Sequence, residues 1–202
     1  YNESNHGAVY PTPVIGMVGL LDDSSKNMDI SFKEPGDIIV VIGALNGGIG
    51  GSEYLKLYHG LVEGPIPEIN LEIECSIQKI CVELISNGLI KSAHDISDGG
   101  LSVNLSESIC FSKKGIGAEI NIERKLRTDE ILFGESQGVV VVSLDSKNLH
   151  HVALTAQNHN IHTQTIGVVT DSANLTINNS INLRRSIIEK SYFHSLEKQM
   201  KV

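Results

Sequence analysis

The chain has 202 residues, enough for one large domain or two small ones and enough to bury a core. Hydrophobic residues make up 41% and charged residues 20%, proportions typical of a soluble globular protein. The formal net charge of −8 disfavours non-specific nucleic-acid binding, which needs a basic surface. No apolar run reaches the ~18 residues that span a membrane, and no signal-peptide pattern is present. These properties predict a cytoplasmic protein without a nucleic-acid or membrane partner.

The first part of the chain is predicted to be extended. Residues 1–13 are rich in Asn, Gly and Pro and indicate a lead-in from a preceding domain. The apolar residues 14–21 predict a buried strand, with Gly16 and Gly19 where a neighbouring segment comes close. We therefore place one domain at residues 14–202.

A second strand and a glycine-rich loop come next. Residues 38–42 form a continuous β-branched run, which is typical of strands covered on both faces. The loop at residues 43–54 holds five glycines and can be interpreted as a phosphate-binding loop, but it lacks the Gly-Lys-Ser/Thr ending. A flexible loop that ends at a helix cap, Ser52, is the favoured alternative.

Residues 70–87 form the clearest helical pattern. Apolar residues recur at spacings of three and four, Asn70 can cap the start, and Gly88 can end the helix. This regularity predicts a packing role for the helix. The three cysteines (Cys75, Cys81 and Cys110) have no metal-site spacing, so we expect free, buried thiols in a reducing compartment.

The stretch richest in potential functional side chains is Ala93–Leu101, with the sequence AHDISDGGL. Its pattern predicts a strand, a glycine turn and a helix. The start of a helix favours an anion, and the glycines allow close approach to it. Because a carboxylate repels a bare phosphate, the carboxylates of this turn, Asp95 and Asp98, are better suited to hold Mg²⁺ that bridges to the phosphate. The alternative is that Ser97 or Asp98 only caps the helix.

The rest of the chain alternates helices and strands. We predict a helix at 101–114, strands at 118–122 and 139–142, a helix at 146–159, a strand at 165–170, a hairpin at 175–183 and a helix at 184–200. Glu135-Ser136-Gln137 precedes the 139–142 strand and places three hydrogen-bonding side chains at a sheet end. Covered strands that alternate with helices predict an α/β fold.

Several motifs together indicate a family. They are Tyr1–Glu3, Tyr10–Gly19, Gly51–Tyr54, Ala93–Leu101 and Leu132–Gln137. Their order and spacing resemble the second half of phosphoribosylformylglycinamidine synthase, the synthetase component of the fourth step of purine biosynthesis. The similarity extends over about residues 1 to 170, and a set of motifs in one order is far more specific than a single glycine loop.

This resemblance implies a fold and an activity. The family looks like two fused copies of an AIR-synthetase-like unit, and the chain resembles the C-terminal half of the second copy. The implied fold is a three-layer α/β/α domain with a mixed sheet that is partly ferredoxin-like. The family's ligases use ATP to activate the amide oxygen of formylglycinamide ribonucleotide, and ammonia from glutamine displaces that oxygen.

The resemblance also implies site residues by position. Asp95 corresponds to a Mg²⁺ ligand of the first copy. The expected nucleotide and substrate contacts are Ser97, Gly99, Gly100, Glu135, Ser136 and Gln137. His94 does not correspond to the family's catalytic histidine, which belongs to the first copy, so we assign no catalytic residue.

The short form of the family's enzyme relies on a separate glutaminase subunit and a small bridging subunit, and the resemblance implies both as partners. A Gly-Asn-x-Ser ligand stretch is expected immediately before Tyr1, in the remainder of the polypeptide. We therefore expect these residues to make no product alone. Two alternatives stay open. One is the C-terminal domain of another AIR-synthase-superfamily enzyme, such as AIR synthetase, selenophosphate synthetase or a thiamin-phosphate kinase, and the other is a non-catalytic docking module.

Overall fold

The computed structural model describes residues 3–4, 7–9, 12–123 and 126–200. Its strands are β1 (Glu3–Ser4), β2 (Gly7–Ala8), β3 (Ile38–Ile42), β4 (Ser92–Asp95), β5 (Gly117–Ile120), β6 (Val140–Leu144), β7 (Thr163–Thr170), β8 (Asn174–Ile177) and β9 (Ile181–Arg184). Its α-helices are α1 (Leu71–Ser86), α2 (Gly100–Cys110), α3 (Thr128–Phe133), α4 (Leu149–Asn158) and α5 (Arg185–Met200). Short 3-10 turns lie at Ser24–Lys26 (η1) and Ser146–Asn148 (η3), and a π-helical turn at Leu55–His59 (η2).

A mixed sheet of seven strands organises the body, in the order β4-β6-β3-β7-β5-β8-β9. Neighbouring strands are antiparallel except for the parallel pair of β5 and β8. Along the chain, β3-α1-β4 is followed by β6-α4-β7, and these four strands lie in the order β7-β3-β6-β4. This is the ferredoxin-like arrangement that the family resemblance implied. The α/β fold with a mixed sheet is confirmed.

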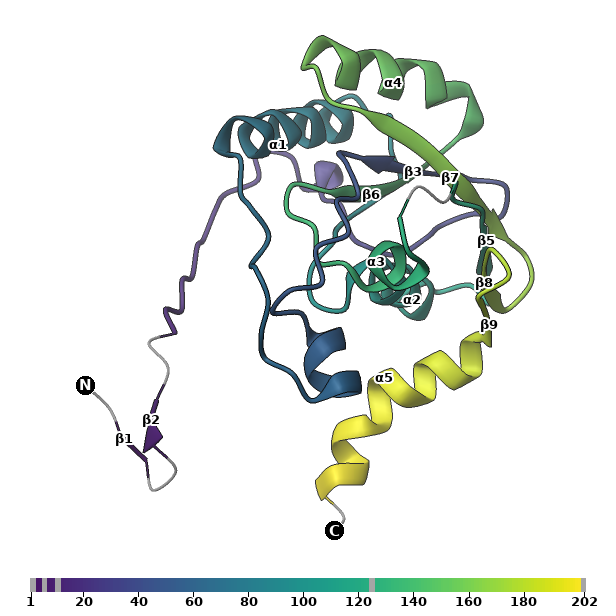
Figure 1. Ribbon diagram of the computed structural model, residues 1–202. Helices are drawn as coiled ribbons and strands as arrows, with labels where there is room; N and C mark the ends of the chain where they lie inside the picture. Colours follow the sequence, from purple (N-terminus) through teal and green to yellow (C-terminus); the bar gives the residue numbers. More distant parts are fainter. Residues whose placement is uncertain (1–2, 5–6, 10–11, 124–125, 201–202) are drawn as a thin grey trace.

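Helices cover both faces of the sheet, as Figure 1 shows. Ile39 and Val41 of β3 point into a core shared with α2 and α3, whereas Val40 and Ile42 point into a second core shared with α1 and α4. All four side chains are almost fully buried. The β-branched run therefore serves two cores at once, which confirms the prediction of a strand covered on both faces and the three-layer architecture.

The caps of α1 act as the sequence predicted. The Asn70 side-chain oxygen accepts hydrogen bonds from the backbone N–H groups of Glu72 (3.0 Å) and Ile73 (3.2 Å). At the other end, Gly88 adopts a φ of 64°, and its N–H donates to the carbonyl of Ile85. A side chain at the start and a left-handed glycine at the end thus satisfy groups that the helix cannot pair internally.

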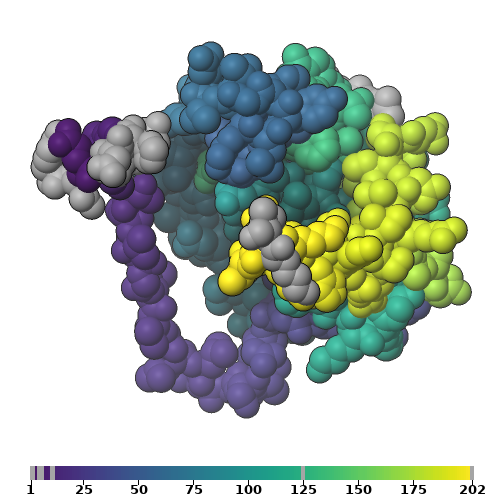
Figure 2. All heavy atoms as spheres, turned by 90° about the horizontal axis from the view of Figure 1, so that it is seen from below, coloured from purple at the N-terminus to yellow at the C-terminus, as the bar shows by residue number. Residues whose placement is uncertain are grey.

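The prediction of a buried strand at residues 14–21 is wrong. No strand forms there, and the apolar side chains lie in solvent, with Met17 92% and Val18 101% exposed. Figure 2 shows this arm leaving the body, with an open gap between the two. Burial of these apolar side chains would be favourable in free energy, but no described residue covers them. Residues 1–2 and 10–11 of the first two family motifs lie outside the described residues.

Other differences are smaller. The helix predicted at 101–114 ends at Cys110, and the short helix α3 was not predicted. Cys75 is exposed on α1, so the expectation of a buried thiol is wrong there, while Cys110 is buried. None of the described helices combines the length and the apolar character needed to cross a membrane.

Candidate functional site

The predicted site residues lie where three segments meet: the glycine-rich loop 43–54, the turn 96–99 and the loop 134–138. Glu135 joins them. Its carboxylate Oε1 accepts hydrogen bonds from the backbone N–H of Gly99 (2.8 Å) and of Glu53 (2.9 Å). Its own backbone N–H donates to the carbonyl of Gly48 (2.9 Å). Because two backbone donors occupy this carboxylate oxygen, the structure gives Glu135 an organising role.

The two residues after Glu135 differ in exposure. Ser136 is buried, and its Oγ accepts a hydrogen bond from the backbone N–H of Asn46 (3.0 Å), which fixes the start of the glycine-rich loop. Gln137 is exposed, and within the described residues its side chain makes no hydrogen bond. Of the Glu-Ser-Gln motif, Gln137 is therefore the side chain open to a ligand.

The two glycines allow the turn before α2 to form and α2 to pack closely. Gly99 and Gly100 have φ angles of 80° and 69°, in the left-handed region. A Cβ at Gly100 would lie 2.7 Å from the carbonyl carbon of Phe133 and 2.9 Å from the carbonyl oxygen of Gly134. Gly100 is thus required for α2 to pack against α3, a role separate from close approach to a ligand.

Asp95 stands at the end of β4 with its carboxylate free. It is exposed, and no hydrogen bond or ion pair engages that side chain within the described residues. Asn104 of α2 donates from Nδ2 to the carbonyls of His94 (3.1 Å) and Asp95 (2.9 Å), which holds the strand end in place. The Oδ1 atom of Asn104 is buried without a partner. The end of β4 therefore carries the exposed Asp95 carboxylate and lies beside the Asn104 side-chain oxygen of α2, which has no hydrogen-bond partner within the described residues.

The described residues offer no preformed metal cage. No group of three or more His, Cys, Asp and Glu side chains among them is arranged to hold a metal ion. Mg²⁺ is commonly held by one or two carboxylates together with phosphate oxygens and water. Asp95 fits such a role as a single protein ligand, with the rest of the shell supplied by a nucleotide and water.

His94 belongs to the packing of the site. Its Nε2 lies 3.2 Å from the Glu107 carboxylate, its Nδ1 lies 3.4 Å from Ser108 Oγ, and its side chain is only 11% exposed. Both partners are on α2, so His94 ties that helix to β4.

The rim of the glycine-rich loop carries an aromatic stack that joins two of the family motifs, Gly51–Tyr54 and Leu132–Gln137, a contact that was not predicted. The rings of Tyr54 and Phe133 stack with centroids 4.8 Å apart, and Tyr58 stacks on the other side of Tyr54 at 5.6 Å. Ser52 caps the turn below, because its Oγ accepts from the N–H of Leu55 (3.3 Å). At the exposed edge, Glu53 accepts a hydrogen bond from Lys56 (2.8 Å), which raises the pKa of that lysine. The prediction of a loop that ends in a Ser52 cap is confirmed.

A cavity of about 710 Å³ lies beyond the other end of the same loop, and no sequence pattern predicted it. Residues that line it include Leu45, Glu123, Ile131 and Gln164. None of the predicted site residues lines this cavity.

The fold and the three-segment site define the class of protein. Residues 34–178 match the family described as "AIR synthase related protein, C-terminal domain", so the chain belongs to this family. The matched region runs from just before β3 to just after β8 and includes all three segments of the site.

Two similar curated relatives are subunits of one enzyme. The chain is 40% identical over 190 residues to the phosphoribosylformylglycinamidine synthase subunit PurL of Alkaliphilus metalliredigens, an alignment that covers 94% of this chain and 26% of the relative. It is 44% identical over 169 residues to the subunit of the same name from Caldanaerobacter subterraneus, covering 84% of this chain and 23% of that one. The chain therefore spans about a quarter of the length of these relatives.

Solved structures agree on the fold. Thermotoga maritima PurL complexed with ATP matches with a TM-score of 0.64 and 19% identity, over 82% of this chain and 28% of that one. The same protein complexed with FGAR matches with a TM-score of 0.68 and 18% identity, over 82% and 30%. A structure described as PurLQS from the same organism matches with a TM-score of 0.65 and 20% identity, over 82% and 28%.

Proposed function

We propose that this chain is the C-terminal domain of the second half of a phosphoribosylformylglycinamidine synthase synthetase subunit, the ATP-dependent ligase that converts formylglycinamide ribonucleotide to the amidine in purine biosynthesis. The observation that carries this proposal is the 40–44% identity to PurL subunits along most of the chain. It also disfavours the other enzymes of the superfamily. Residues 14–202 would form the domain and residues 1–13 the lead-in to it.

The site would hold a Mg²⁺-nucleotide. Asp95 would supply one carboxylate to the metal, and the exposed side chains of Ser97 and Gln137 would face the ligand. Gly99 and Gly100 would shape the turn behind them, because the Gly99 N–H already donates to Glu135 and Gly100 is buried. Glu135 and Ser136 are engaged with backbone amides. The Mg²⁺ would offset the charge of the phosphates against Asp95. No catalytic residue is assigned to this chain, and the catalytic histidine would lie elsewhere in the complete enzyme.

The partners would include the remainder of the polypeptide and two further subunits. The arm at residues 14–21 exposes a run of apolar side chains, and burying apolar surface contributes roughly 25 cal/mol per Å². The rest of the synthetase would cover this arm. A glutaminase subunit would supply ammonia and a small bridging subunit would join the two, and all of them would work in the cytoplasm.

A chimera tests the proposal. This chain would replace the aligned 190 residues of the Alkaliphilus subunit, in cells that lack their own synthase. We expect growth without added purines, and loss of growth with the same chimera carrying a stop codon at the junction. The isolated chain, given ATP, substrate and ammonium, should make no product. Turnover by the isolated chain would contradict the proposal, and so would a well-expressed, folded chimera that gives no growth.

A docking module without a ligand is the second candidate function. The described residues do not favour it over a nucleotide site, because one carboxylate with phosphate oxygens and water can hold Mg²⁺ without a group of three metal-ligating side chains. The two candidates differ in one respect, because a docking module tolerates Asp95→Ala without losing any ligand. Chimeras with Asp95→Ala that grow like the parent would favour docking.

A further inference from the structure

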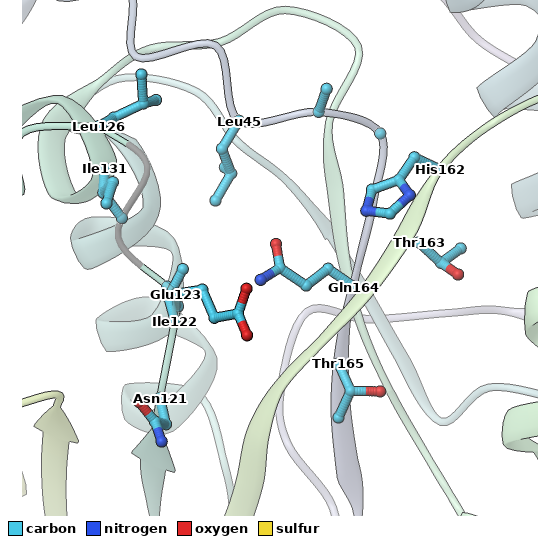
Figure 3. A pocket seen from close by; sticks show the side chains of 12 residues that line it. Leu45, Asn121, Ile122, Glu123, Leu126, Ile131, His162, Thr163, Gln164 and Thr165 are labelled. Atoms are coloured by element: carbon cyan, nitrogen blue, oxygen red, sulfur yellow. The ribbon is translucent and has the colours of Figure 1, made fainter.

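The 710 Å³ cavity at the end of the sheet combines an apolar wall with a polar one. Leu45, Leu126 and Ile131 form the apolar wall, and Glu123 and Gln164 belong to the polar wall. Figure 3 shows the carboxylate of Glu123 and the amide of Gln164 pointing toward each other from different segments, with Leu45 reaching toward the same space. Apolar side chains around a few convergent polar groups are typical of small-molecule sites, and the volume is within their usual range.

The charge of the cavity favours a cation. Among the described lining residues, Glu123 is the one acidic side chain, none is a lysine or arginine, and His162 is the one side chain that can carry a positive charge. Within the described part of the chain, the Glu123 carboxylate has no hydrogen bond or ion pair. Arg124 and Lys125, which follow it in the sequence, lie outside that part. The formal charge of −8 for the whole chain acts in the same direction as Glu123.

We propose that this cavity binds a small organic cation in which an amidinium group is joined to an apolar ring. The carboxylate of Glu123 would accept two parallel N–H bonds from the cation, the geometry that makes charge-assisted pairs strong. The side-chain oxygen of Gln164 would accept another, and the ring would lie against Leu45 and Ile131. The site shares no lining residue with the nucleotide site, so it does not depend on the proposed function.

Benzamidine and its neutral analogue benzamide test this proposal. We expect benzamidine to cause saturable NMR shifts of the Leu45 and Ile131 methyl groups, with a Kd on the order of 1 mM or below. Glu123→Gln should weaken benzamidine binding about tenfold, because the carboxylate charge is lost while the shape is kept. Glu68→Gln removes an exposed carboxylate outside the cavity and should leave the affinity unchanged. Benzamide should bind about tenfold more weakly than benzamidine to the parent chain, and equally to both variants.

Two results would overturn the proposal. One is the absence of saturable shifts at Leu45 and Ile131, and the other is equal benzamidine affinity of Glu123→Gln and the parent. Glu123 is exposed, so the variant should fold, and an unchanged thermal unfolding midpoint verifies this. Gln164→Met, which removes the amide at similar length, should also weaken binding. Titration of the same samples with a nucleotide tests the proposed function separately, so failure of the cation proposal can be distinguished from failure of the nucleotide site.

Discussion

Removing the Glu135 carboxylate should loosen all three segments of the site. In Glu135→Ala, the N–H groups of Gly99 and Glu53 lose an ionised acceptor at 2.8 and 2.9 Å. Each hydrogen bond to a charged group contributes roughly 1.5–3 kcal/mol net. Glu135 is only half-buried, so water can reach the freed amides and the loss stays near the lower end, at about 2–3 kcal/mol in total.

Urea unfolding and amide hydrogen exchange measure this effect. The loss corresponds to a fall in Tm of about 4–12 °C for a chain of this size. Exchange of the Gly99 and Glu53 amides should become faster, while amides within the strands keep their protection. Glu135→Gln keeps an acceptor oxygen and should cost about 1 kcal/mol. The matched control is Gln137→Ala, because Gln137 is exposed and its side chain lacks a hydrogen bond in the described structure. If Glu135→Ala unfolds like the parent and both amides exchange at parent rates, the organising role of Glu135 is refuted.

Three further outcomes follow from the packing. Gly100→Ala should lower the free energy of unfolding by roughly 2–4 kcal/mol, measured in urea, because residue 100 has a left-handed backbone conformation and its new Cβ would meet the backbone of α3. Gly115→Ala is the control and should be nearly neutral, because the space around Gly115 is open. Asn70→Ala should cost about 1 kcal/mol through loss of the α1 cap, and an unchanged unfolding midpoint would contradict the cap's contribution. Burial, with a smaller contribution from Glu189, raises the pKa of Cys110 to about 11. At about pH 8.5 its thiol should stay protonated and react far more slowly with iodoacetamide than exposed Cys75, which mass spectrometry checks.

Sequence patterns correctly predicted the helices, strands and turns whose formation depends on residues close together in the sequence. The β-branched run of β3 and the Asn70 cap of α1 formed as expected, because propensity, spacing and capping act within a few residues. The hairpin of β8 and β9 also formed, with Asn178 in the left-handed conformation that turns favour. The ferredoxin-like strand order came from the family resemblance, since pairing between distant strands leaves no local pattern.

The features that the sequence did not predict depend on residues far away in the sequence or on surfaces outside the chain. The Glu135 carboxylate bonds to amides 36 and 82 residues away, and nothing near Glu135 in the sequence indicates those donors. The arm at residues 14–21 has the apolar pattern of a buried segment, but a pattern cannot name the surface that buries it. The residues that line the cavity around Glu123 are far apart in the sequence, at 43–45, at 121–123 with 126 and 131, and at 162–165, and no spacing pattern links them.

We propose that this domain holds a Mg²⁺-nucleotide through Asp95. Calorimetric titration of the chain with Mg²⁺-ADP, repeated with Asp95→Asn and with Gln137→Ala, tests it most directly. We expect saturable binding to the parent, loss of binding in Asp95→Asn and weaker binding in Gln137→Ala. Binding of equal strength to the parent and Asp95→Asn would contradict the role of the carboxylate. No heat of binding to the parent, with a folded chain, would contradict a nucleotide site contained in this domain.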